Sequence, residues 1–432
     1  MSWDVVSDRP ARRWPLAVVG GGPAAAMQAL SWGGDPGEVV VVASHWGSGM
    51  GFMGDAELQS YRHELLIPGA PEELAAMLPP GRLRPSSAQY DAYVVACLRS
   101  VGAHLVDGTV EDLAPVAGSG PGSWDSACVL RVRNADGSSH LMEAETVVLA
   151  TGSRPKPAPP EWAALGAVGY DEVYRMTPEE RAELCRDKRL VIVGAGNSGM
   201  QTAALVAGLG RDVVILASRY HGIFPVETED RYAWRGQSGL TCELVAKSAM
   251  SCRDGLMSGI CIRLLVYREL ELVPGEVLRF RIGYLDADND VRLTRCSLPG
   301  RCEHAVAERA GDGWAEWREA DTVVIWATGS EPVYPPSAAL SALPREADGR
   351  IRVDEDGRTA WRSVYLTGAS RGHRSVNEMT PAVAADRIVA IGAAGTASAA
   401  SATGPATASS TSSTSSTSTP IGTVGESVRD VR

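Results

Sequence analysis

The chain has 432 residues, of which 44% are hydrophobic and 22% charged, and its formal net charge is −11. At roughly 150 residues a domain, this length predicts two or three domains, and the negative charge argues against nucleic-acid binding as the main role. No apolar run reaches the roughly 18 to 20 residues of a membrane-spanning helix, and charged residues precede the first apolar stretch, unlike in a secretory signal. We therefore expect a cytoplasmic protein with no membrane or nucleic-acid partner.

Short runs rich in β-branched residues alternate with helical stretches along residues 1–392. The expected strands are residues 16–20, 38–43, 145–152, 189–194, 212–218, 321–329 and 363–368, and the expected helices are residues 23–31, 87–101, 198–208 and 381–391. This alternation predicts an α/β fold with parallel sheets and β-α-β crossovers. Residues 103–145 instead suggest short antiparallel strands, broken by GSGPGS and NADGSS, that form a small sheet grafted onto an α/β domain.

The C-terminal segment differs in composition from the rest of the chain. Residues 393–420 contain only Ala, Gly, Ser, Thr and Pro. Such a segment buries too little surface to offset its ordering entropy. The sequence therefore predicts a disordered tail over residues 393–432.

The eight cysteines are scattered along the chain, and none lies in a CxxC motif. The closest pair, Cys296 and Cys302, has a spacing typical of neither zinc ribbons nor redox dithiols. We interpret the cysteines as reduced thiols that pack as small hydrophobic residues. We expect no metal site and no catalytic dithiol.

The first glycine motif directly follows the strand expected at residues 16–20. In VVGGGPAAAM, Gly20 and Gly22 take the first two positions of G-x-G-x-x-G/A, and Ala25 takes the third. Glycines at these positions permit a tight turn and the close approach of a pyrophosphate, whose charge then lies at a helix N-terminus. The order of strand, turn and helix favours a dinucleotide site over a turn whose glycines serve packing alone.

The second glycine motif is complete. In RLVIVGAGNSGMQ, Gly194, Gly196 and Gly199 form G-x-G-x-x-G between an apolar strand and an alanine-rich helix. The next strand ends at Ser218 and Arg219 instead of an acid. Because an arginine there suits the 2′-phosphate of NADPH, we predict NADPH with Ser218 and Arg219 as contacts. The alternative is that Arg219 merely faces solvent.

The two motifs strengthen each other, since each is followed by a strand that ends in Ala-Thr-Gly, at residues 150–152 and 327–329. Two such units predict FAD and a nicotinamide nucleotide that exchange a hydride.

We expect an FAD-binding domain in two parts (residues 1–155 and 331–392), a linker (156–187) and an inserted NADPH-binding domain (188–330). The further expected cofactor contacts are Pro23, Ala24, Val110, Thr151, Gly152, Asn197, Ser198, Thr328, Gly329 and Gly368.

The end of the second expected strand departs from this pattern. It ends in Ala43-Ser44-His45, where an acid would bind the adenosine ribose of FAD. Ser44 offers a single hydrogen bond in place of a bidentate carboxylate. We therefore expect loosely held FAD, and the flavin-to-protein absorbance ratio of the isolated protein tests this.

Residues 45–66, HWGSGMGFMGDAELQSYRHELL, resemble a stretch of the flavin-dependent N-hydroxylating monooxygenases, the lysine and ornithine hydroxylases of siderophore synthesis. Trp46, Ser48, Gly49 and Met50 match directly, and Gln59 matches a family glutamine after a one-residue insertion. The resemblance covers roughly residues 15–392. GAGNSGM, at residues 194–200, also resembles the flavin-containing and Baeyer–Villiger-type monooxygenases.

The resemblance implies a reaction in which NADPH reduces FAD and O₂ then forms a flavin C4a-hydroperoxide. That species would hydroxylate a nitrogen of a small amine or amino-acid-derived substrate, in secondary metabolism. It also implies that Trp46, Met50 and Gln59 contact the cofactor and that Gln59, His63 and Asn377 are catalytic. A loop glutamine that bonds the backbone is the alternative reading of Gln59.

A second departure bears on the substrate. His63 stands where ornithine hydroxylases have a lysine for the substrate carboxylate, and no lysine precedes Lys156. A histidine that is only partly charged near neutral pH is a poorer carboxylate anchor, so a free basic amino acid is less expected here. Arg62 as the anchor, or a purely structural His63, are the alternatives.

The resemblance is uneven in the second half of the chain. In residues 220–321 the asparagine that touches substrate and NADP⁺ in the family has no counterpart that we can identify. Residues 369–391 resemble the closing loop and helix over the flavin, where His373, Asn377 and Thr380 are expected near flavin or substrate. Thr380 followed by Pro381 also fits an N-cap with proline at the first helical position.

Three other functions stay open beside N-hydroxylation. The same architecture oxidises sulfur or ketones, and a flavin-binding protein without catalysis would explain the missing ribose acid. A disulfide reductase is disfavoured by the lack of a CxxC. The sequence leaves the oligomeric state open, with a homo-oligomer among the alternatives.

Overall fold

The computed structural model describes most of residues 12–384. The described residues are 12–56, 58, 60–81, 83–116, 127–164, 166–194, 197–206, 208–217, 262–273, 277–282, 313–318, 322–373 and 376–384. Four residues that the sequence assigns to the site, Gln59, Gly196, Ser218 and Arg219, lie outside these ranges, as does the expected tail.

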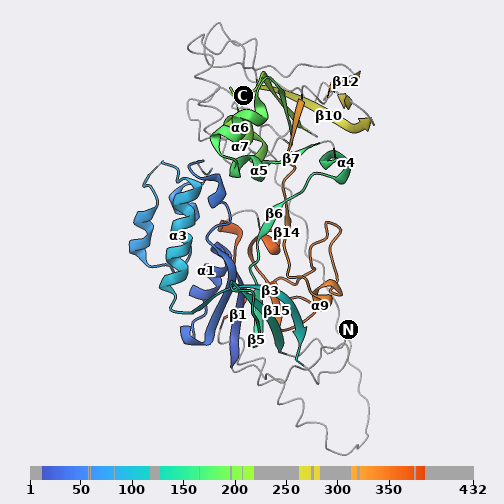
Figure 1. Cartoon of the computed structure of the whole chain (residues 1–432). Coiled ribbons are helices and arrows are strands. Elements are labelled where there is room, and N and C mark those ends of the chain that lie inside the picture. The colour runs from blue at the N-terminus through green and yellow to red at the C-terminus, as the bar shows by residue number, and fades with distance from the viewer. Residues whose placement is uncertain are drawn as a thin grey trace, which may run out of the picture. The chain divides into compact units, whose positions relative to one another are not determined.

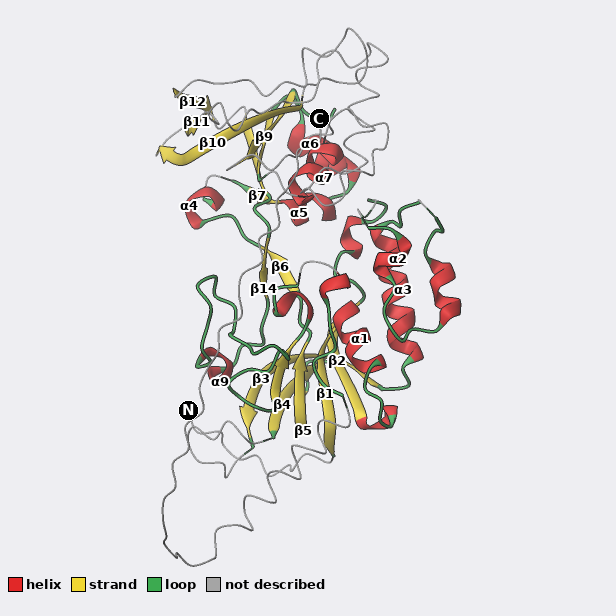
Figure 2. Cartoon of the chain, turned by 180° about the vertical axis from the view of Figure 1, so that it is seen from behind, coloured by secondary structure: helices red, strands yellow, loops and turns green. Residues whose placement is uncertain are grey.

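Six strands form the first sheet, in the order β1-β2-β3-β4-β5-β15 with an added pairing of β1 with β5. They are β1 (Arg13–Gly21), β2 (Val39–Trp46), β3 (His104–Pro115), β4 (Cys128–Asn134), β5 (Ser139–Leu149) and β15 (Val364–Leu366). β1 runs parallel to β2 and to β5, and β15 runs parallel to the end of β5. The carboxyl ends of these strands therefore lie at one edge of the sheet, where nucleotides bind in such folds (Figures 1 and 2).

The antiparallel insertion is present, but it is not a separate sheet. The first part of β3 pairs in parallel with β2, and its second part pairs antiparallel with β4. β5 likewise begins at Ser139 beside β4 and continues between β1 and β15. The expectation of a grafted small sheet is corrected, because β3 and β5 are long enough to belong to both parts.

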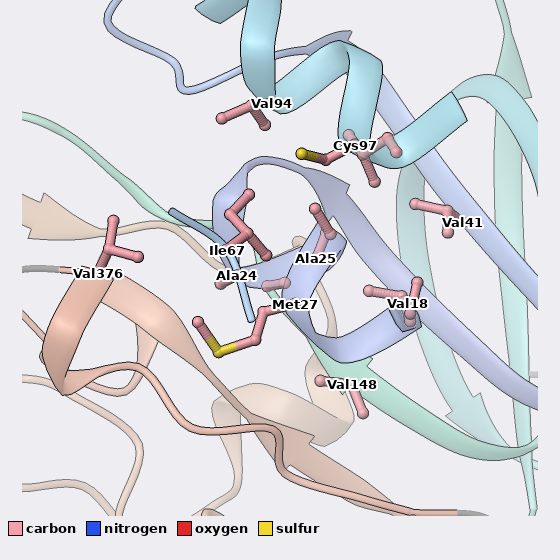
Figure 3. Close-up of a cluster of buried hydrophobic side chains, with 14 of the residues drawn as sticks. Val18, Ala24, Ala25, Met27, Val41, Ile67, Val94, Cys97, Val148 and Val376 are labelled. Carbon is pink, nitrogen blue, oxygen red and sulfur yellow. The ribbon is translucent and has the colours of Figure 1, made fainter. Parts of the chain in front are cut away.

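Alternate residues of the central strands face two different cores, as the two-residue period of a strand requires. On β1, Leu16 and Val18 belong to the core that includes α1 (Pro23–Leu30) and α3 (Ser87–Ser100), whereas Ala17 and Val19 belong to the core of the opposite face. Figure 3 shows part of the first core, where side chains of α1, α3 and the sheet come together. Its α1 residues are mostly alanines, which let the helix lie close to the strands.

Residues at the N-termini of α1 and α3 favour the start of a helix at these positions. Pro23 occupies the first turn of α1, where its missing N–H costs nothing. α3 begins with a capping box, in which the Ser86 hydroxyl accepts from the Gln89 N–H (3.2 Å) and the Gln89 side chain accepts from the Ser86 N–H (2.9 Å). α3 ends at Ser100, one residue before the predicted end.

Seven strands form the second sheet, in the order β12-β11-β10-β9-β8-β13-β7. They are β7 (Val168–Gly169), β8 (Arg189–Val193), β9 (Asp212–Ala217), β10 (Ile262–Val273), β11 (Val277–Ile282), β12 (Gly313–Arg318) and β13 (Thr322–Trp326). The pairs among β7, β13, β8, β9 and β10 are parallel, and β10, β11 and β12 pair antiparallel. α7 (Asn197–Val206) connects β8 to β9.

Short elements complete the described part of the chain. A two-stranded ribbon pairs β6 (Ser153–Pro155) with β14 (Ser330–Pro332). The others are η1 (Pro36–Glu38), η2 (Gly51–Met53), α2 (Arg62–Leu65), η3 (Glu72–Met77), α4 (Pro160–Ala163), α5 (Tyr170–Arg175), α6 (Pro178–Cys185), α9 (Ala338–Ser341), η6 (Gly368–Ser370) and η7 (Val376–Glu378). Within residues 156–187, which we expected as a linker, β7 pairs with β13, and Val173 and Cys185 lie in the core of the second sheet.

The predicted strands and the first three predicted helices are confirmed, apart from end residues and the earlier start of β5. The helix predicted over residues 381–391 is wrong for Pro381–Ala384, which have no helical structure, and residues 385–391 lie outside the described ranges. The physical reason is a tertiary contact. The side-chain oxygen of Gln28 accepts from the N–H groups of Ala382 (2.7 Å) and Val383 (3.2 Å) and ties this segment to α1.

Among the helices of the described residues, none has the length and apolar character that crossing a membrane requires.

Candidate functional site

The turn after β1 has the backbone geometry that only glycine tolerates. Gly20 has φ +121°, and an ideal Cβ added to it would lie 2.2 Å from the carbonyl oxygen of Ala150, at the end of β5. A Cβ on Gly21 would lie 2.4 Å from the carbonyl oxygen of His45. These two glycines therefore let β1 approach its neighbours on both sides.

Gly22 differs from both, because no described atom comes close to the position that a Cβ on it would take. Its φ is −94°, and an ideal Cβ would meet no described atom closer than the Gly47 carbonyl oxygen, at 3.5 Å. Gly22 is also the N-cap of α1 and has no side chain to occupy the first-turn N–H groups, including those of Ala24 and Ala25. Packing does not explain a glycine here, whereas a pyrophosphate placed against the helix N-terminus does. The residues present fit a dinucleotide.

The turn after β8 repeats this design. Gly194 has φ +112°, and an ideal Cβ on it would lie 2.3 Å from the carbonyl oxygen of Ala327, which follows β13 as Ala150 follows β5. A Cβ on Gly199 would lie 2.0 Å from the Gly194 carbonyl oxygen, so this glycine permits α7 to approach the turn. Two equivalent turns therefore lie on two sheets.

The end of β2 carries no acid, but a carboxylate from the next strand is close to it. Ser44 and His45 are exposed, and the indole N–H of Trp46 donates to a carboxylate oxygen of Asp107. The register of β2 and β3 pairs Ala43 with Asp107. Asp107 could not be predicted from the sequence, because its position near the end of β2 depends on which strands pair. Asp107 is the carboxylate closest in register to the place where an acid was expected.

The loop after β2 carries the residues of the family resemblance and lies against the first glycine turn. The Gly47 N–H donates to the Gly21 carbonyl oxygen at 2.9 Å, and the Trp46 ring carbon Cε3 would lie 3.0 Å from a Cβ on Gly21. Met50 is 36% exposed. The motif-bearing loop therefore borders the space beside Gly22.

Asp91 of α3 holds this loop. The Ser48 N–H and hydroxyl both donate to its Oδ1, at 2.6 Å and 2.9 Å, and the Ser48 hydroxyl accepts from the Met50 N–H at 3.2 Å. Asp91 and Ser48 are part-buried. Sequence reasoning missed Asp91, which lies 43 residues from its partner.

The structure describes two of the three expected catalytic residues. His63, in α2, is exposed, and its ring stacks on Tyr61 with 5.9 Å between centroids. Asn377 belongs to η7, and Gln59 lies outside the described residues.

The loop after β15 reaches the N-terminus of α1. Gly368 has φ +65°, and a Cβ on it would lie 2.6 Å from the Cβ of Ala24. The His373 N–H donates to the Gly368 carbonyl oxygen at 3.1 Å. Burial and the nearby Arg371 lower the pKa of His373, and its buried Nδ1 has no hydrogen-bond partner among the described residues.

The remaining expected contacts lie at the carboxyl ends of strands or in the core. Thr151 donates its hydroxyl to the Val333 carbonyl oxygen, and Gly152 and Gly329 have positive φ angles of +72° and +99°. Thr328 is exposed. Val110 is 5% exposed and packs in the core, so only its backbone is available to a cofactor.

The described cysteines do not form a redox centre. Cys97, Cys128 and Cys185 are all free and buried. Burial raises the pKa of the Cys97 and Cys185 thiols and raises that of Cys128 to about 12. Thiols of this kind are poor nucleophiles at neutral pH. Within the described ranges, no group of three or more His, Cys, Asp or Glu side chains is arranged to hold a metal ion.

Solved structures of flavoproteins share this fold. The bacillithiol disulfide reductase of Bacillus cereus is 16% identical, with a TM-score of 0.57 over 88% of this chain and 99% of that one. The ornithine N-hydroxylase of Kutzneria sp. 744 is also 16% identical, with a TM-score of 0.56 over 89% of this chain and 100% of that one. The cadaverine monooxygenase DfoA of Erwinia amylovora is 12% identical, with a TM-score of 0.58 over 84% and 90% of the two chains. At these identities the likeness shows the fold alone.

Curated relatives match a shorter stretch. The soluble pyridine nucleotide transhydrogenase of Photobacterium profundum is 35% identical over 102 residues, which are 23% of this chain and 20% of that relative. The chain thus matches about a fifth of the length of these relatives. The family model of the pyridine nucleotide-disulphide oxidoreductases matches residues 14–232, just over half of the chain. The chain therefore belongs to the pyridine nucleotide-disulphide oxidoreductase family, and it is a flavin-dependent oxidoreductase whose cofactors are FAD and NADP(H).

Proposed function

We propose that the protein is an NADPH- and FAD-dependent monooxygenase that hydroxylates a nitrogen of a small amine or amino-acid-derived substrate. The observation that carries this proposal is the loop after β2. Trp46, the last residue of β2, and Ser48, Gly49 and Met50 of the loop match the N-hydroxylating monooxygenases, and the loop contacts the first glycine turn through the Gly47 N–H (2.9 Å to Gly21). In this proposal the matching residues border the flavin site.

The cysteines support the same proposal, because those in the described part of the chain are not arranged to accept electrons from the flavin. A disulfide reductase passes electrons from the flavin to a dithiol, and this chain has no CxxC. The described cysteines are buried, with raised pKa values. A small oxidant such as O₂ needs no dithiol.

In this proposal the chain's residues bind the cofactors and exclude water. Gly22 and the first turn of α1 take the FAD pyrophosphate, and the loop after β15 closes over the same helix end. Gly194, Gly196 and Ser198 take the NADPH pyrophosphate, and Ser218 and Arg219 take its 2′-phosphate. Bound FAD, reduced by NADPH, supplies the chemistry that activates O₂.

We assign three residues to the substrate. Gln59 lies at the flavin or the substrate, and His63 and Asn377 contact the substrate in this proposal. Because His63 replaces a lysine, the expected substrate is a small amine or a pathway intermediate more than a free basic amino acid. The scattered cysteines, none of which lies in a CxxC motif, support a cytoplasmic location as part of this proposal.

A second candidate is a monooxygenase of the same architecture that oxidises sulfur or a ketone. GAGNSGM, at residues 194–200, favours it because it resembles the flavin-containing and Baeyer–Villiger-type monooxygenases. The product distinguishes the two: a hydroxylamine in the first case, a sulfoxide or an ester in the second.

Substrate-dependent NADPH oxidation tests the proposal. FAD-loaded protein is given NADPH, O₂ and a panel of amines, with H₂O₂ and products measured in parallel. We expect at least one amine to yield a hydroxylamine with little H₂O₂. Uncoupled oxidation with every amine contradicts the proposal. Hydride transfer to NAD⁺ or reduction of a disulfide without O₂ would instead indicate a transhydrogenase or a reductase.

Arg219→Ala tests the choice of NADPH. We expect the variant to raise the Michaelis constant for NADPH about 10-fold or more, since a charge-assisted contact to phosphate contributes roughly 1.5 to 3 kcal/mol. The constant for NADH should change little. Equal effects on both nucleotides would mean that Arg219 does not contact the 2′-phosphate.

A further inference from the structure

The five-residue loop from Gly47 to Gly51 is built around one carboxylate. Asp91 Oδ1 accepts two hydrogen bonds from Ser48, at 2.6 Å from the N–H and 2.9 Å from the hydroxyl. The same hydroxyl accepts from the Met50 N–H (3.2 Å), so the carboxylate fixes both sides of the loop through Ser48.

The glycines of this loop fit the same carboxylate. A Cβ on Gly47 would lie 2.4 Å from Asp91 Oδ1, and one on Gly51 would lie 2.8 Å from Asp91 Oδ2. Gly47 also has φ +122°, which other residues rarely adopt. The Cα atoms of Gly47 and Gly51 thus lie directly against the carboxylate, which leaves no room for a longer side chain on α3.

The loop is also joined to the space beside Gly22. The Gly47 N–H donates to the Gly21 carbonyl oxygen, and the Gly47 carbonyl oxygen is the atom nearest to a Cβ placed on Gly22, at 3.5 Å. A shift of the loop therefore moves one border of the cofactor site.

We propose that Asp91 is a positioning residue for FAD, which holds the Gly47–Gly51 loop, through Ser48, in the conformation that receives the flavin cofactor. The inference depends on FAD binding and not on the reaction that follows, so its test needs no turnover. It stands or falls separately from the proposed N-hydroxylation.

Three substitutions of Asp91 separate its charge, its hydrogen bonds and its length. Asp91→Asn keeps an oxygen acceptor for the Ser48 N–H and removes the charge. Asp91→Ala removes the acceptor. Asp91→Glu keeps the charge, but its extra methylene has no room between Gly47 and Gly51 unless the loop moves.

The measurement is FAD binding to the apoprotein, followed by flavin fluorescence, with the visible circular dichroism of the bound flavin and the thermal midpoint of the apoprotein. We expect the FAD dissociation constant to rise about 3- to 10-fold for Asp91→Asn and about 10- to 100-fold for Asp91→Ala and Asp91→Glu. The visible circular dichroism at saturating FAD should change in the last two. The thermal midpoint of the apoprotein should change little.

Three further variants test the Ser48 contact and provide a control. Ser48→Ala should weaken FAD binding, and the double variant Asp91→Asn/Ser48→Ala should be no more than about twofold worse than the weaker single variant, because both act through one contact. Asp35 is the matched control. It accepts from the Gly37 N–H at 2.8 Å in the turn that precedes β2, and Asp35→Ala should leave FAD binding unchanged.

Two results would overturn the proposal. One is a dissociation constant within twofold of the wild-type value for both Asp91→Ala and Asp91→Glu. The other is a lower apoprotein midpoint in all three Asp91 variants with an unchanged flavin circular dichroism, which would leave Asp91 a purely structural role. If Asp91→Ala does not fold, Asp91→Asn and Ser48→Ala decide by the same two criteria.

Discussion

At the scale of single residues, Gln28 joins α1 to residues 382 and 383, which lie far from it in the sequence. Its side chain is fully buried in α1, its amide nitrogen donates to the Val383 carbonyl oxygen at 2.6 Å, and its oxygen accepts from the N–H groups of Ala382 and Val383. A buried backbone N–H or carbonyl group that loses its hydrogen-bond partner lowers the free energy of unfolding. The amide therefore satisfies three backbone groups that no helix satisfies here.

Gln28→Ala is expected to lower the free energy of unfolding by about 2 to 4 kcal/mol, because it leaves these buried backbone groups without partners. Denaturant unfolding of the apoprotein measures this. Gln89→Ala, which removes the exposed half of the α3 capping box, is the control and should cost about 1 kcal/mol or less. Equal losses in both variants would mean that the Gln28 contacts add nothing beyond an ordinary cap.

His373 predicts a pH dependence of stability. Burial, with Arg371 adding to it, lowers its pKa in the folded protein, while Glu378 opposes the shift. As the pH falls below about 6.5, the unfolded chain binds a proton that the folded protein does not yet bind, so stability decreases. His373→Asn should weaken this acid decrease between about pH 6.5 and the lowered folded value. His140→Asn, at an exposed position, should leave it unchanged.

At the scale of elements, two glycines near the end of β1 have different roles: Gly20 permits close packing of the strands, and Gly22 leaves space for a cofactor. Gly20→Ala puts a Cβ 2.2 Å from the Ala150 carbonyl oxygen at a positive φ, and we expect a loss of about 3 kcal/mol or more in unfolding free energy. For Gly22→Ala, the nearest described atom to the new Cβ is the Gly47 carbonyl oxygen, at 3.5 Å, and the change should cost about 1 kcal/mol or less in unfolding free energy. It should nevertheless weaken FAD binding by 10-fold or more. Unfolding midpoints and flavin titrations check both, and unchanged FAD affinity in Gly22→Ala would contradict a pyrophosphate at this turn.

What the sequence predicts depends on how local each feature is. Gly20, Gly22 and Gly194 were found because strand, turn and helix follow one another within a few residues. Asp107 was not, since it reaches the end of β2 only through strand register. The prediction of a helix at residues 381–391 depends on local sequence, including Thr380 and Pro381 as a helix start, and a side chain 354 residues away overrides that preference at Ala382. Asp91 was missed for the same reason, because its partner lies on another element.

At the scale of the whole molecule, the two nucleotide turns belong to different sheets with different cores. Leu16 and Val18 of β1 belong to the core that includes α1 and α3, whereas Leu190, Ile192 and Ile325 belong to the core of the second sheet. We expect Gly22→Ala apoprotein to bind NADP⁺ within about twofold of the wild-type affinity, although its affinity for FAD is 10-fold or more weaker. Calorimetric titration measures this. A parallel loss of both nucleotides would show that the two sites form together.

The pairing of β15 with β5 and the bonds of Gln28 to residues 382 and 383 also set an order of events during synthesis. A ribosome that adds about 5 to 20 residues per second needs roughly 10 to 50 s to travel from the end of β5 to Val383. Throughout that interval the edge of β5 lacks β15, and the amide of Gln28 lacks residues 382 and 383. The strands of the second sheet are synthesised during the same time. A nascent chain is therefore exposed to edge-to-edge association at β5 until residues 364–366 of β15 are made. Slow translation of that stretch lengthens the period in which a chaperone has to cover it.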